Sequence, residues 1–135
     1  MKNRRSFIKK TAAFSLAGML SLSKNAAAGE IQIKGALIHH VYFWLKEPEN
    51  EDHKKELISG LKKLLKVKTI KMSHIGVPAG TESRDVVDHS YSVSYMVMFD
   101  NQAGQDAYQV DPIHTKFVDD YSHLWKKVIV YDSID

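Results

Sequence analysis

The segment from Ala36 to Leu45 constrains the fold more than any other part of this sequence, because it is apolar on both faces of a predicted strand. Most of its residues are β-branched, aromatic or histidine, and alternate residues of a strand point to opposite faces of a sheet. One face carries Leu37, His39, Val41, Phe43 and Leu45, and the other carries Ile38, His40, Tyr42 and Trp44. A strand of this kind is covered on both sides. The sequence therefore predicts a sheet with a layer against each face.

The rest of the sequence predicts further strands and helices in a fixed order. Leucines at helical spacing follow Asn50, a residue suited to the N-cap, and lysines end that segment. Asp111 and Pro112 restart a helix after a short break. In chain order we expect a strand at 36–45, a helix at 50–66, a strand at 69–77, a long loop at 76–90, a strand at 91–99, helical segments at 103–110 and 111–125, and a strand at 128–132.

This βαββαβ order is typical of the ferredoxin-like α+β fold, in which helices cover one side of an antiparallel four-stranded sheet. The second face of the sheet then needs a cover of its own. Two such sheets packed face to face would supply it, so we expect a homodimer with a barrel-like interface, a dimeric α/β-barrel.

Residues 1–28 have the pattern of an export signal. Arg4 and Arg5 precede a short apolar run, and Ala26 to Ala28 offers the small residues that a signal peptidase recognises. The paired arginines indicate the twin-arginine export machinery. The alternative is a permanent amphipathic anchor, but the apolar run is shorter than the roughly 20 residues that span a bilayer. We expect cleavage near Ala28, a domain over residues 29–135, and a periplasmic protein without stable membrane insertion.

The composition excludes several other classes of protein. Six of the 19 basic side chains and no acidic one lie in residues 1–28, which leaves 13 basic against 16 acidic groups in the remainder. A domain of that balance lacks the basic face that nucleic-acid binding needs. The chain contains no cysteine, so disulfides and thiolate zinc sites are excluded.

His114 is the strongest candidate for chemistry. It falls in the first turn of the last predicted helix, where the positive end of the helix dipole disfavours the imidazolium form. A neutral imidazole can serve as a general base. Tyr108 precedes the helix break and could face the same cleft. The alternative is structural: a helix-capping His114 packed under Trp125, with Tyr108 in the core.

No metal or cofactor site is expected. His39 and His40 are neighbours on a strand and point to opposite faces, so they cannot share a ligand. Asp111 and His114 lie one helical turn apart, but two ligands make a poor metal site. No flavin, haem, nucleotide or phosphate-loop motif is present.

Three stretches of the sequence resemble the stress-responsive dimeric α/β-barrel (Dabb) family. They are Ile38–Lys46, Ala107–His114 and Trp125–Asp132, and the Tyr…Pro-x-His element is the most specific of them. The resemblance covers essentially the whole of residues 29–135. It implies a ferredoxin-like homodimer, in agreement with the pattern of elements.

The resemblance also implies roles for particular residues. His114 and Tyr108 match the catalytic pair of a plant polyketide cyclase in the family, and His40 matches a further pocket histidine. Phe117 and Trp125 match apolar lining positions of that pocket. The match implies that His40, Tyr42 and Trp44 lie on the helix side of the sheet, with Tyr42 and Trp44 in the pocket lining. Val41, Phe43 and Leu45 would then face the partner subunit. A second pocket histidine of the cyclase is replaced here by Val93.

Three functions remain open at this point. The first is an exported, cofactor-free lyase or cyclase that acts on a small aromatic or polyketide-like substrate through the Tyr–His pair. The second is a non-catalytic stress-response or ligand-binding homodimer with a small apolar or aromatic ligand. The third is cofactor-free oxygen chemistry, as in related ferredoxin-like dimers.

Overall fold

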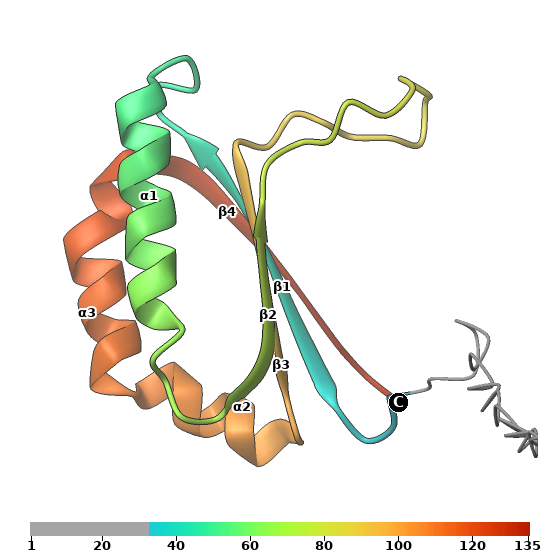
Figure 1. The fold of residues 1–135 in the computed structure, drawn as a ribbon, viewed down its shortest axis with the longest axis vertical. Coiled ribbons are helices and arrows are strands. Elements are labelled where there is room, and N and C mark those ends of the chain that lie inside the picture. The colour runs from blue at the N-terminus through green and yellow to red at the C-terminus, as the bar shows by residue number, and fades with distance from the viewer. Residues whose placement is uncertain (1–32) are drawn as a thin grey trace, which may run out of the picture. The chain divides into compact units, whose positions relative to one another are not determined.

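An antiparallel four-stranded sheet organises residues 33–135, the part of the chain that the computed structural model describes. The strand order is β2-β3-β1-β4, and the helices all lie on one side of the sheet (Figure 1). In chain order the elements are β1 (Leu37–Leu45), α1 (Glu51–Leu64), β2 (Ile70–Gly76), β3 (Val93–Phe99), α2 (Gln102–Val110), α3 (Pro112–Tyr121), a 3₁₀ turn (Ser122–Leu124) and β4 (Trp125–Ile134). The predicted ferredoxin-like fold is confirmed.

The first helix begins and packs as its sequence predicts. The Asn50 side chain accepts hydrogen bonds from the backbone N–H groups of Asp52 and His53, which satisfies two of the free donors at the helix start. Leu57 and Leu61 are fully buried against the sheet. This apolar stripe decides which face of the sheet the helices cover.

Asp111 sets the break between α2 and α3. Its backbone is extended, and its carboxylate accepts a hydrogen bond from the backbone N–H of Ile113. Pro112 occupies the first turn of α3, where its missing N–H costs nothing. The break therefore places His114 at the start of α3, as predicted.

The last helix is shorter than its periodicity indicates. Helical spacing predicts Trp125 on the helix, but α3 ends at Tyr121 and Trp125 is the first residue of β4, paired with Leu45. The backbone N–H of Lys46 donates to the carbonyl of Leu124, 2.9 Å away. Pairing with β1 thus ends the helical segment earlier than helical spacing predicts.

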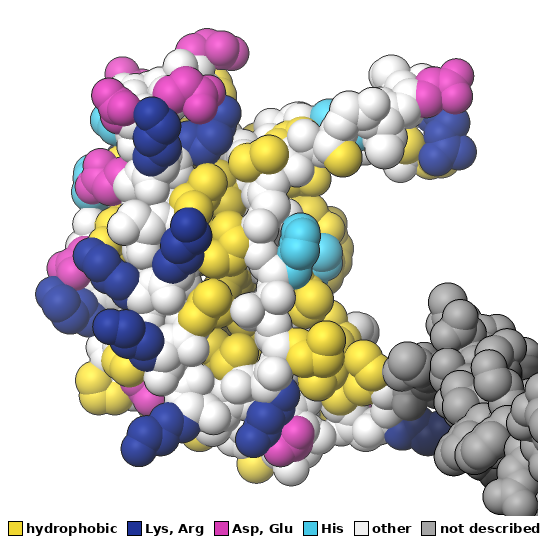
Figure 2. Space-filling model, in the orientation of Figure 1, with side chains coloured by type: hydrophobic (Ala, Val, Ile, Leu, Met, Phe, Trp, Pro, Cys, Tyr) yellow, Lys and Arg dark blue, Asp and Glu magenta, His cyan; other side chains and the backbone are white. Residues whose placement is uncertain are grey.

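The prediction of which face of β1 meets the helices is wrong. Val41, Phe43 and Leu45 are 5%, 4% and 0% exposed and belong to the core beneath the helices, so they do not face a partner subunit. His40, Tyr42 and Trp44 are half-buried on the opposite face. Alternation shows which residues share a face but not which face the helices cover, and both faces of this strand are apolar. The side of the sheet away from the helices, here called the open face, carries hydrophobic and histidine side chains (Figure 2).

The predicted export signal at residues 1–28 lies outside the described residues, as does the start of the predicted domain at residue 29. Among residues 33–135, no helix has the length and apolar character needed to cross a membrane.

Candidate functional site

A cavity of about 130 Å³ lies between the helix-covered face of the sheet and the helices α2 and α3. Apolar side chains from β1, α3 and β4 form most of its wall, and a few polar groups interrupt them. The polar groups are His39, Tyr95, Tyr108, Gln109 and His114. A small apolar pocket with a few convergent polar groups is the usual form of a ligand or substrate site.

His114 is held in one tautomer by the end of α2. Its Nδ1 lies 3.1 Å from the carbonyl oxygen of Gln109, so Nδ1–H donates and Nε2 keeps a free lone pair. Burial lowers the pKa of His114 from its ordinary value, although the bond to Gln109 opposes that shift. The imidazole is therefore neutral at pH 7 and can accept a proton at Nε2.

Tyr108 packs directly against His114, with ring centroids 4.6 Å apart. It is 1% exposed, and its hydroxyl donates to the hydroxyl of Tyr95 over a long distance of 3.5 Å. Burial raises the pKa of Tyr108 to about 12. Tyr108 thus stays protonated at neutral pH and provides an O–H donor, which a ligand oxygen can recruit because the bond to Tyr95 is weak.

A histidine–carboxylate pair also lies beside Tyr108. Nδ1 of His39 is 2.6 Å from an Oδ1 oxygen of Asp132, and the two residues are opposite each other in the β1–β4 pairing. The His39 ring is buried and meets the Tyr108 ring edge-on at 5.7 Å. The short bond identifies Nδ1–H as the donor and leaves Nε2 of His39 free.

The pattern of residues in the sequence does not predict this pair. It depends on which residue of β4 lies opposite His39, and that register is set by the assembled sheet. The one signal in the sequence was that His39 shares a face with apolar residues, since a buried imidazole needs a polar partner.

The structure brings together four of the predicted site residues and separates the others. Tyr108, His114, Phe117 and Trp125 all line the cavity. His40, Tyr42 and Trp44 lie on the open face, so their predicted place in this pocket is wrong. His39 occupies the position predicted for His40, because the expected face of β1 was inverted and a shift of one residue exchanges the faces of a strand.

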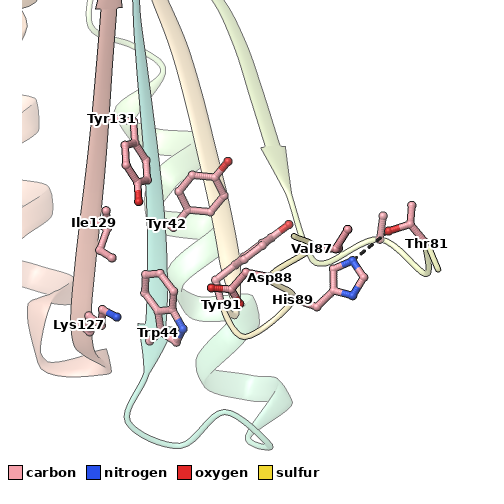
Figure 3. Close-up of a pocket in the computed structure, with 11 residues that line it drawn as sticks. Tyr42, Trp44, Thr81, Val87, Asp88, His89, Tyr91, Lys127, Ile129 and Tyr131 are labelled. Atoms are coloured by element: carbon pink, nitrogen blue, oxygen red, sulfur yellow. Dashed lines mark hydrogen bonds between the residues drawn. The ribbon is translucent and has the colours of Figure 1, made fainter. Parts of the chain in front are cut away.

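The open face carries a larger hollow of about 430 Å³, between the sheet and the loop that follows β2 (Figure 3). Tyr42, Trp44, Tyr91 and Tyr131 contribute aromatic rings to its lining. The Nζ of Lys127 lies over the Trp44 ring, 4.4 Å from its centroid. A wide aromatic surface of this kind is typical of a site that another protein surface covers.

Within residues 33–135, no group of three or more His, Cys, Asp or Glu side chains is placed to hold a metal ion.

Comparison with known proteins gives one family. The model described as Stress responsive A/B Barrel Domain (Dabb) matches residues 37–135. No curated protein sequence matches this chain.

Solved structures share its fold at low sequence identity. A Dabb family protein with a ferredoxin-like fold from Mesorhizobium loti is 21% identical, with a TM-score of 0.62 over 76% of this chain and 98% of that chain. The hydroxynitrile lyase from Passiflora edulis is 17% identical, with a TM-score of 0.63 over 77% of this chain and 95% of that one. A dimeric ferredoxin-like protein of unknown function from Thermobifida fusca is 17% identical, with a TM-score of 0.62 over 78% and 96%.

Proposed function

The chain belongs to the stress-responsive A/B barrel (Dabb) family, and from that premise we propose that it is a homodimeric, cofactor-free lyase or cyclase. Its reaction is the aldol-type formation or cleavage of a carbon–carbon bond in a small aromatic or polyketide-like carbonyl compound. The observation that carries this proposal is the fixed tautomer of His114 beside Tyr108 in an apolar cavity.

His114 is the proposed general base. Its Nε2 removes a proton from the carbon next to a carbonyl group, which leaves an enolate on the substrate. The enolate carbon then attacks a second carbonyl carbon of the same molecule, and the new alkoxide takes the proton back from Nε2. The protons balance over the cycle, and cleavage follows the same steps in reverse.

Tyr108 is the proposed donor to the enolate oxygen. Its phenol stays protonated because burial raises its pKa to about 12. A buried donor that is already in place stabilises negative charge more strongly than water does. The long bond to Tyr95 is the interaction that the substrate oxygen replaces.

His39 is the proposed second hydrogen-bonding group, oriented by Asp132. The carboxylate accepts from Nδ1–H, so Nε2 keeps a lone pair that can accept a hydrogen bond from a substrate hydroxyl. The hydroxynitrile lyase from Passiflora edulis has the same fold, which supports a lyase as one of the reactions proposed here.

The homodimer and the export route are parts of the same proposal. The aromatic open face supports a second copy as its cover, as does the dimeric protein of the same fold from Thermobifida fusca. The two arginines and the alanine-rich end of residues 1–28 support twin-arginine export to the periplasm.

A ligand-binding homodimer without turnover is the second candidate. The burial of Tyr108 and its existing bond to Tyr95 favour it, because a satisfied phenol in a core is often structural. Both candidates require a ligand in the cavity, and only the enzyme requires proton removal.

The test combines ligand binding with proton exchange on the purified full-length chain. Small aryl ketones and β-keto acids are screened by thermal shift, and exchange of their α-protons in D₂O is followed by NMR. We expect a stabilising ligand whose exchange slows by about 10²–10⁴-fold in His114→Ala. His123→Ala is the matched control, since His123 is exposed and lies outside the cavity.

The outcomes separate the candidates. A stabilising ligand with no exchange above the buffer rate overturns the enzyme and supports the binding protein. Exchange that persists in His114→Ala overturns His114 as the base. A chain that no compound stabilises and that accelerates no exchange overturns both functions.

A further inference from the structure

The cavity beneath the helices lies along β1, and its two ends differ in chemistry. At one end the rings of Phe43, Phe117 and Trp125 pack together, with centroids 5.1 to 6.4 Å apart. At the other end, His39 and Tyr108 provide polar atoms. His39 and Phe43 are four residues apart on one strand, which separates their backbones by roughly 13 Å. A ligand that fills the cavity therefore meets an aromatic end and a polar end at once.

The volume of the cavity limits the ligand to a single ring. The cavity measures about 130 Å³. In another protein, an apolar cavity of about 150 Å³ holds one benzene molecule. One six-membered ring consequently takes up most of the space, which leaves room for a short carbonyl group and none for a second fused ring.

The lining of the cavity favours an uncharged ligand. Among residues 33–135, no Lys, Arg, Asp or Glu side chain belongs to this lining. The carboxylate of Asp132, 2.6 Å from Nδ1 of His39, places a negative charge behind the polar end. A ligand carboxylate would lose its hydration here without gaining a cationic partner, and that loss is costly.

The cavity reaches the surface between α3 and β4. Three valines of its lining are partly exposed, Val118 on α3 at 39%, and Val128 and Val130 on β4 at 36% and 44%. β4 is an edge strand of the sheet. The helices all lie on one side of the sheet (Figure 1), so this opening is on that side, and a second copy packed on the open face leaves it accessible.

We propose, as an extension that rests on the function proposed above, that the cavity takes an uncharged aryl carbonyl compound with a single ring. The compound enters between α3 and β4, past three valines that offer no partner to a charged group. Its ring packs against Phe43, Phe117 and Trp125 in the edge-on or offset arrangements that aromatic rings prefer. Its carbonyl group then lies at the polar end, within the reach of Tyr108 and His114.

The test measures dissociation constants for matched pairs of ligands, by NMR titration of the purified full-length chain. Benzamide and benzoate have the same shape and differ in charge, whereas acetophenone and 2-acetonaphthone differ by one fused ring. We expect benzamide to bind more tightly than benzoate, and acetophenone more tightly than 2-acetonaphthone, each by about tenfold or more.

Two variants should convert exclusion into binding, a gain that loss of the fold cannot imitate. Val118→Lys places an ammonium group at the opening and should tighten benzoate binding about threefold. Val110→Lys is the matched control, since Val110 is exposed and lies outside the cavity lining, and it should leave benzoate binding unchanged. Trp125→Leu removes one ring of the wall and should bring the affinity for 2-acetonaphthone close to that for acetophenone.

Each result bears on a separate part of the proposal. Benzoate that binds the wild type as tightly as benzamide overturns the uncharged ligand class, and equal binding of the two ketones overturns the limit to one ring. An equal effect of Val118→Lys and Val110→Lys on benzoate overturns the opening between α3 and β4. The expected preferences in a chain that accelerates no α-proton exchange support this ligand class and overturn only the enzyme. Exchange without these preferences overturns the ligand class and leaves the enzyme standing.

Discussion

His39 and His40 are neighbours in the sequence, but they lie on opposite faces of the sheet and in different environments. On the helix-covered face, His39 is 6% exposed and is bonded to a carboxylate. On the open face, His40 is half-buried and stacks on Tyr42. Full burial demands a strong partner for a polar ring, whereas partial exposure leaves the ring available.

The comparison shows that one step along a strand separates two different sites. The covered face holds a small cavity lined by two imidazoles and two phenols, and the open face holds a wide aromatic surface. Adjacent residues on one strand are therefore matched controls for each other.

The largest expected difference concerns stability and the pair Met98 and Phe99. Phe99 is fully buried beneath the helices, so Phe99→Ala should lower the free energy of unfolding by about 3–5 kcal/mol. Met98 lies half-buried on the open face, and Met98→Ala should cost less than Phe99→Ala because it leaves a smaller cavity. Urea unfolding at one fixed protein concentration measures both. Equal costs would contradict the assignment of the two faces.

Assembly should distinguish Tyr131 from Val130. Tyr131 lines the open face, so in the proposed homodimer Tyr131→Glu would bury a charge between two copies and should weaken their association about a hundredfold, or roughly 2.7 kcal/mol. Val130 faces the cavity side, and Val130→Glu should leave the dimer intact. Sedimentation velocity over a concentration series reports the association. A monomer in the wild type, or a dimer that tolerates Tyr131→Glu, would remove the open face as the interface.

Ligand binding should distinguish His39 from Ile38. His39→Gln removes the imidazole beside Tyr108 and should weaken the cavity ligand about tenfold, close to 1.4 kcal/mol. Ile38→Gln alters the neighbouring position on the open face and should change affinity less than twofold. Isothermal titration with the best compound from the thermal-shift screen checks both variants. Equal losses would show that the cavity does not depend on His39.

The smallest expected effect is on stability against pH. Burial lowers the pKa of His114 and of His40 from the ordinary value of 6.5. The unfolded chain therefore takes up these protons more readily than the folded chain, so the free energy of unfolding should fall as pH drops below 6.5 and be level above it. Urea unfolding between pH 5 and 8 measures the slope, which His114→Ala should reduce. A slope of the opposite sign would contradict the pKa directions.

The sequence predicted more of the fold than of the site. Three features of the sequence were enough to predict the element order and the position of His114: the alternating pattern of the strands, the Asn50 cap and the Asp111–Pro112 break. The end of α3 was missed because Phe117, Tyr121 and Trp125 keep helical spacing, and only pairing of Trp125 with Leu45 ends the helix. Helical spacing in the local sequence does not show whether a segment continues a helix or pairs as a strand with a distant part of the chain.

By itself, the sequence determined which residues of each strand share a face, because alternation is a property of the backbone alone. It also determined the Tyr–His neighbourhood, since a helix break places both residues within a few positions of each other. Only the tertiary structure decided which face the helices cover and which residue of β4 meets His39. Both depend on long-range packing of the leucine stripe of α1 and on strand register, and two apolar faces on β1 leave that choice open until the helices pack.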